Sequence, residues 1–151
     1  MITTNGANIL IAMILKDSVP ANKVKDITGA VMTTSISITA LNFTRKYVPG
    51  SSSGVMMHFG SGTTDASNDD YCLADDLGIT PATVTAGKNG NKWYVNAILT
   101  NTGSSAITIN EIGVTAGTQS NSKEYLIARK VVPTRTVAVG ETATFTFTLD
   151  F

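Results

Sequence analysis

The last stretch of the chain alternates between apolar and polar residues without a break, and this constrains the fold more than any other feature. From Ala143 to Phe151 every second residue is apolar, and threonines or an aspartate stand between them. Successive side chains of a β-strand point to opposite faces of a sheet. This segment is therefore expected to form a strand with an apolar inner face and a threonine-rich outer face.

Other segments carry the same signals. Residues 93–100 also alternate, and residues 106–115 alternate with a change of phase that a β-bulge near Glu111 would restore. Further strands are predicted between Gly- and Ser-rich turns, two of which are 49–54 and 86–91. These strands cover residues 34–39, 42–48, 55–59, 123–131 and 136–139. The sequence thus predicts an all-β fold: a single antiparallel β-sandwich domain over residues 1–151, jelly-roll or immunoglobulin-like, with seven or eight strands.

The first 17 residues differ from the rest and predict one short N-terminal helix, capped by Thr4 or Asn5. Its apolar residues recur at helical spacing and are expected to share one face. That face packs either on the core of its own domain or on a neighbouring subunit. The residues concerned are Ile9, Leu10, Met13 and Ile14.

The same N-terminal segment bears on localisation. The apolar run 7–15 is short, whereas a membrane-spanning helix needs about 20 apolar residues. A signal peptide begins with basic residues, but here the first cation, Lys16, follows the apolar run. We therefore expect no membrane insertion and no signal peptide. The single cysteine, Cys72, excludes an intramolecular disulfide and fits a protein made in a reducing cytoplasm.

The balance of charges argues against nucleic acid as a partner and for other copies of the chain. Eleven basic residues equal eleven acidic ones, and a nucleic-acid-binding protein would need an excess of Lys and Arg. Only 15% of residues are charged, and Thr is the most frequent residue type. A neutral, threonine-rich surface has little electrostatic repulsion between copies, so it favours self-association. A plain soluble sandwich that happens to be neutral is the alternative.

The one acidic cluster suggests a weak metal candidate. Asp65, Asp69 and Asp70 lie in one loop, and such dense oxygen ligands can hold Ca²⁺. The loop lacks the glycine that an EF-hand has at its sixth position, where Asp70 stands. The alternative is a turn whose Asp and Asn side chains accept hydrogen bonds from backbone amides.

No catalytic constellation stands out. Ser61 and His58 are close in sequence but three residues apart on a strand, which places them on opposite faces. Residues 60–64 lack the lysine of a phosphate-binding loop. Cys72 lies beside apolar residues and is expected to be a buried structural thiol. We therefore predict no enzyme activity, no catalytic residue and no cofactor. Arg129, Lys130 and Arg135 are expected to form a small basic patch at a subunit contact or on a solvated surface.

The order of these segments resembles small virion structural proteins of tailed bacteriophages, in particular tail-, neck- or fibre-associated β-sandwich subunits. The resemblance covers nearly the whole chain, and its motifs are structural turns. It is carried by the N-terminal Thr-Asn-Gly and by residues 41–44, 59–64, 70–73, 101–113, 126–129 and 139–142. Where the family often has Pro-Gly-Glu, this chain has Val139-Gly140-Glu141.

The resemblance implies a structural, non-enzymatic virion subunit that assembles by protein–protein contacts with itself and with other virion proteins. A capsid decoration or head-fibre protein is one alternative. Another is a binding module whose loops 51–54 and 63–70 recognise a host-surface glycan or protein. The candidate interface residues are Ile9, Leu10, Met13, Ile14, Arg129 and Arg135.

Overall fold

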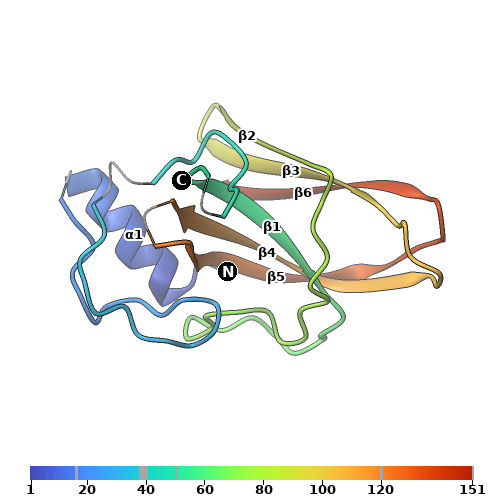
Figure 1. Ribbon diagram of the computed structural model, residues 1–151, viewed down its shortest axis with the longest axis horizontal. Helices are drawn as coiled ribbons and strands as arrows, with labels where there is room; N and C mark the ends of the chain where they lie inside the picture. Colours follow the sequence, from blue (N-terminus) through green and yellow to red (C-terminus); the bar gives the residue numbers. More distant parts are fainter. Residues whose placement is uncertain (16, 38–40, 50, 120, 151) are drawn as a thin grey trace.

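Two three-stranded antiparallel sheets and a short helix make up the fold (Figure 1). A computed structural model describes residues 1–15, 17–37, 41–49, 51–119 and 121–150, with Ile14 described by its backbone alone. Within these ranges the elements are helix α1 (Thr4–Leu15) and strands β1 (Gly54–Gly60), β2 (Thr83–Asn89), β3 (Lys92–Thr100), β4 (Ile107–Thr118), β5 (Lys123–Val137) and β6 (Thr142–Asp150). The predicted all-β sandwich with one N-terminal helix is confirmed.

The strand order is β1-β4-β5 in the first sheet and β2-β3-β6 in the second. β2–β3 and β4–β5 are hairpins, whereas the β3–β4 and β5–β6 links cross between the sheets at the end opposite α1 (Figure 1). Because of these two crossings, β6 returns to pair with β3 from Lys92↔Asp150 to Thr100↔Thr142.

A single apolar core fills the space between the sheets. The predicted apolar inner face and threonine-rich outer face of β6 are confirmed, because Ala143, Phe147 and Leu149 are buried while the threonines between them are exposed. The ring centroids of Phe59 on β1 and Phe145 on β6 lie 5.0 Å apart, which joins the two sheets directly. Such aromatic pairs stabilise a core beyond their buried area.

The β1-β4-β5 sheet is covered on its outer face as well. β4 is buried along almost its whole length. Tyr47 packs against Gly117 and Leu73 packs against Gly113, where an added Cβ would lie 2.3 Å and 2.7 Å from the respective side chains. The two glycines therefore let the segments before β1 and after it lie close against this sheet.

Helix α1 is fastened to β5 through its first turn. Thr3 Oγ1 accepts a hydrogen bond from Gly6 N (3.0 Å), which caps the helix, and donates one to Leu126 O (2.6 Å). A Cβ on Gly6 would lie 2.0 Å from Ile127 O, so only glycine allows this close approach. The predicted caps, Thr4 and Asn5, are wrong, because the helix begins one residue after Thr3. No helix in the described ranges is long and apolar enough to cross a membrane.

The described residues form six strands, not the seven or eight predicted, and one predicted turn and four predicted strands need correction. The turn predicted at 86–91 is confined to Gly90 and Asn91, because β2 continues to Asn89 and pairs with β3 as far as Lys92. Residues 42–48 form only isolated bridges, and so does the described part of 34–39. The segments predicted at 123–131 and 136–139 join into one strand, β5, as far as Val137. The predicted bulge is confirmed by the register shift between Ile109 and Glu111.

Candidate functional site

The outer side of α1 is apolar where a surface helix is normally polar. The helix contains no charged residue from Thr4 to Leu15. Ile9 and Ala12 are buried against the sandwich, yet Ile11 is 54% exposed, Met13 38% and Leu15 69%. A surface helix usually carries polar or charged residues opposite its core face. The helix therefore presents apolar surface that its own domain does not cover.

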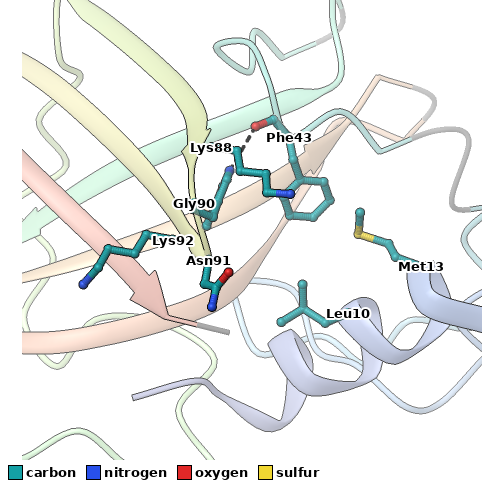
Figure 2. A pocket seen from close by; sticks show the side chains of 8 residues that line it. Leu10, Met13, Phe43, Lys88, Gly90, Asn91 and Lys92 are labelled. Carbon is teal, nitrogen blue, oxygen red and sulfur yellow. Dashed lines mark hydrogen bonds between the residues drawn. The ribbon is translucent and has the colours of Figure 1, made fainter.

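A groove of about 420 Å³ lies between this helix, Phe43 and the β2–β3 hairpin (Figure 2). Leu10 and Met13 point into it from α1, and Phe43 lies on the far side. The groove is lined by Leu10, Met13, Phe43, Lys88, Gly90, Asn91, Lys92 and Trp93. An apolar groove with a few cations on its rim is suited to binding an apolar segment, not to acid–base chemistry.

The groove exists because the inner face of the second sheet continues past the core. Trp93 lies on the same face of β3 as the buried Val95 and Ala97, but is itself only half-buried. Its ring meets Phe43 edge-on at 5.7 Å between centroids, and its Nε1 donates a hydrogen bond to Phe43 O at 3.3 Å. The Trp93–Phe43 pair thus forms a fixed apolar floor at the end of the sandwich.

Two lysines of the hairpin stand on the rim. Lys92 Nζ lies 2.9 Å from Asp150 Oδ1 in an exposed ion pair. Lys88 forms no ion pair with any residue that the structure describes. We use the term α1 surface for the exposed helix face and the apolar groove residues together: Leu10, Ile11, Met13, Leu15, Phe43 and Trp93.

The residues predicted as an interface do not share one surface. Leu10 and Met13 line the groove, but Ile9 is fully buried, so it belongs to the core face of the helix. The side chain of Ile14 lies outside the described residues. Arg135 is exposed and pairs with Glu141 at 3.0 Å. Sequence spacing identified the helix and left open whether its apolar face packs on its own core or on a neighbouring subunit. For Ile9 the first alternative holds, and the spacing did not identify the exposed Ile11 and Leu15.

Arg129 was expected in a surface basic patch, and this is wrong. Its residue exposure is 1%, because its side chain lies under the loop that follows β1. Nε donates to Glu111 Oε2 at 2.6 Å, and Nη1 donates to Asp70 Oδ2 at 2.7 Å. Nη2 donates to Thr64 O at 2.7 Å and Nη1 to Asp65 O at 3.4 Å. The guanidinium therefore ties this loop to β5.

Glu111 on β4 holds the same loop from the other strand, and we call Arg129 and Glu111 together the loop anchor. Its side chain is fully buried and accepts hydrogen bonds from the backbone N–H of Gly62 (3.1 Å), Ala74 (3.1 Å) and Asp75 (2.8 Å). A buried carboxylate needs such donors as well as a cation. Glu111 and Arg129 together fix both ends of the loop 62–75.

The contact with Arg129 also involves one of the three calcium candidates. The Asp70 carboxylate faces Arg129 and accepts from Ser67 N at 2.8 Å, while Asp65 and Asp69 remain exposed. In the described part of the chain, no three Asp, Glu, His or Cys side chains are grouped so that they could hold a metal ion. Within the loop, the backbone amides of Ser67 and Asp69 donate hydrogen bonds to Asp70 Oδ2 and Ser67 Oγ, as in the capped turn of the alternative interpretation.

His58 bridges two carboxylates on the outer face of the β1-β4-β5 sheet. Nδ1 lies 3.0 Å from Asp76 Oδ2, and Nε2 lies 2.8 Å from Glu124 Oε2. Burial lowers the pKa of His58, but the hydrogen bonds to Asp76 and Glu124 outweigh this and raise it to about 9. The charged imidazolium therefore holds β1, the following loop and β5 together at neutral pH.

The other two candidate reactive groups are Ser61, which is hydrogen-bonded, and Cys72, whose thiol has a raised pKa. Ser61 Oγ donates a hydrogen bond to the Asp75 carboxylate. Cys72 is half-buried, not fully buried as expected. Burial and the negative charge of Asp70 raise the pKa of its thiol, so the thiol stays protonated at neutral pH.

Replacing Arg129 by Met is expected to lower the free energy of unfolding by about 3–5 kcal/mol, because Glu111 would remain buried without its cation. The exposed Arg135, six residues along the same strand, is the matched control. Arg135→Met removes only a surface ion pair and is expected to cost at most about 1 kcal/mol. Urea unfolding of both variants measures the difference, and equal losses would contradict the role of Arg129.

The His58 bridge predicts a pH dependence of stability. The folded-state pKa of about 9 exceeds the ordinary histidine pKa of 6.5, so the bridge contributes fully below pH 6.5. This contribution falls as the pH rises and is lost above about 9, with a total effect of about 2–4 kcal/mol. Urea unfolding at several pH values, compared with His58→Gln, measures it. A variant that loses stability over this range as steeply as the wild type would contradict the bridge.

Comparison of the chain with protein-family models, with curated proteins and with solved structures finds no match.

Proposed function

We propose that this chain is a structural, non-enzymatic subunit that assembles by protein–protein contacts through the α1 surface. The observation that carries the proposal is the helix itself, which has no charge over twelve residues and leaves Ile11 and Leu15 more than half exposed. Contiguous exposed apolar surface on a soluble domain marks interaction sites. Covering each of these side chains with a partner contributes roughly 1–2 kcal/mol.

The rigidity of the α1 surface supports the same function. α1 is held to β5 through Thr3, and Trp93 is held to Phe43, so neither wall of the groove has to be ordered when a partner binds. A surface that is ordered in advance loses less conformational entropy on association. With a net charge of zero, copies of the chain have no net long-range repulsion to overcome.

We place this subunit in the virion of a tailed bacteriophage, within the tail, neck or fibre apparatus. The support is the order of turn motifs along the chain, which resembles that family. A capsid decoration or head-fibre position would use the same kind of contact on a different neighbour. The partners are then other copies of this chain and neighbouring virion proteins.

A charge placed on the α1 surface is expected to block assembly. Ile11→Lys puts a cation on a side chain that is 54% exposed, so the fold tolerates it but a partner cannot desolvate it cheaply. Val139→Lys is the matched control, because Val139 is 55% exposed at the opposite end of the molecule. Light scattering at several concentrations is expected to show association for the wild type and for the control, and a monomer for Ile11→Lys. Equal behaviour of the two variants would contradict the role of α1.

The virion position has its own test. Antibodies raised against the chain are expected to label purified virions of the phage that encodes it, at a regular position on the particle. Pre-incubation of the antibodies with the purified chain is the control and abolishes the label. Unlabelled virions, together with binding of the purified chain to host cells, would support the host-surface binding module instead.

A further inference from the structure

The chain contains two Asn-Gly pairs, Asn5-Gly6 at the start of α1 and Asn89-Gly90 at the tip of the β2–β3 hairpin. A glycine has no side chain, so its backbone nitrogen is open to attack on the asparagine side chain before it. We propose that Asn89 is a site of spontaneous deamidation, whereas the fold protects Asn5. This inference goes beyond the proposed function, because it does not depend on what the α1 surface binds.

The reaction needs only the chain and water. The Gly90 nitrogen loses its proton to hydroxide and attacks Asn89 Cγ, so that an N–C bond forms, the Cγ–Nδ2 bond breaks, and ammonia leaves with a proton taken from water. The product is a cyclic succinimide. Water then opens this ring at Cγ, which gives aspartate, or at the main-chain carbonyl, which gives isoaspartate. In total one water is consumed, one ammonia is released, and a neutral amide becomes a carboxylate.

The reacting groups of Asn89-Gly90 are free of restraints from other described residues. Asn89 is exposed, and its side chain forms no hydrogen bond within the described part of the chain. The N–H of Gly90 donates none there either. Gly90 has a φ of 59° at the first central position of the hairpin turn, and beyond its chain neighbours no atom lies within 4 Å of the place of a Cβ. The Asn89 side chain can therefore turn towards the Gly90 nitrogen.

In Asn5-Gly6, by contrast, hydrogen bonds hold every reacting group. Asn5 is 6% exposed, its Nδ2 donates to Lys25 O at 2.7 Å, and its Oδ1 accepts from Lys25 N at 3.0 Å. Gly6 N donates to Thr3 Oγ1 at 3.0 Å. The side chain and the nitrogen cannot approach each other unless these bonds break, which requires the start of α1 to open.

The products would change the hairpin that forms one wall of the groove. Asn89 pairs with Lys92 and Lys92 pairs with Asp150, so the three side chains lie in a row across one face of the second sheet. A carboxylate at position 89 would therefore compete with Asp150 for Lys92, which lies on the groove rim. Isoaspartate would also lengthen the main chain by one carbon at the end of β2.

The test is incubation of the folded chain at neutral and at mildly alkaline pH, followed by peptide mass spectrometry. We expect the peptide with Asn89 to gain about 1 Da, or about 3 Da in water enriched in heavy oxygen, which shows that the change took place during the incubation. Asn89 is expected to react at least about tenfold faster than Asn5, because Asn5 reacts only when α1 opens. The rate should rise with pH, since the Gly90 nitrogen must lose its proton.

Two controls separate the effect of the fold from the effect of the sequence. In a chain unfolded by urea both pairs are free, so Asn5 and Asn89 are expected to react at similar rates. Asn89→Gln is the matched variant, because its longer side chain would have to close a larger ring. It is expected to fold like the wild type by circular dichroism and to lose the more acidic species that ion-exchange chromatography resolves in the wild type.

Fast reaction of Asn89 in the folded chain, with Asn5 reacting at a similar rate only after unfolding, supports the proposal. A folded chain in which Asn89 reacts no faster than Asn5 overturns it, and so does a more acidic species that persists in Asn89→Gln. None of these results depends on association or on virion labelling, so the proposed function is tested separately.

Discussion

The buried ion pair between Arg129 and Glu111 is the interaction on which the rest of the structure depends. It joins β5 to β4 and holds the loop 62–75 against the outer face of their sheet. Buried charges are costly unless they are paired and hydrogen-bonded, so this pair specifies one position for the loop. The residues just before Arg129 on β5, Leu126 and Ile127, accept the hydrogen bonds that fasten Thr3 and so α1. One segment of β5 thus positions both the loop and the helix.

The groove is a consequence of this arrangement. α1 is fixed at its first turn and packs on the sandwich through Ile9 and Ala12. Its opposite side, with Ile11 and Leu15, therefore stays exposed. The β2–β3 hairpin extends the inner face of the second sheet beyond the core as far as Trp93. An apolar helix face and an apolar sheet end therefore meet at an open edge of the molecule (Figure 2). We propose that assembly covers what folding leaves exposed.

The sequence predicts those features that depend on local periodicity. The alternation in β6 and β3 predicted which of their residues face the core, and the phase change near Glu111 predicted the bulge. The sequence analysis did not predict β2, because the glycines Gly87 and Gly90 are typical of a turn and so the end of the strand and its hairpin were assigned to one long turn. It placed Arg129 on the surface because a sequence shows a charge but not the Glu111 that neutralises it. The groove could not be predicted at all, since Leu10, Phe43 and Trp93 come together only through tertiary packing.

Hydrogen–deuterium exchange at low and high protein concentration tests most directly whether the α1 surface is covered on assembly. We expect exchange to slow with rising concentration in the described part of 10–17 and in 88–93, while β6 and the loop 62–75 stay unchanged. Both regions would change together because both belong to the α1 surface, which a partner is proposed to cover. Slower exchange confined to another segment, in a sample that light scattering shows to be assembled, would contradict the account.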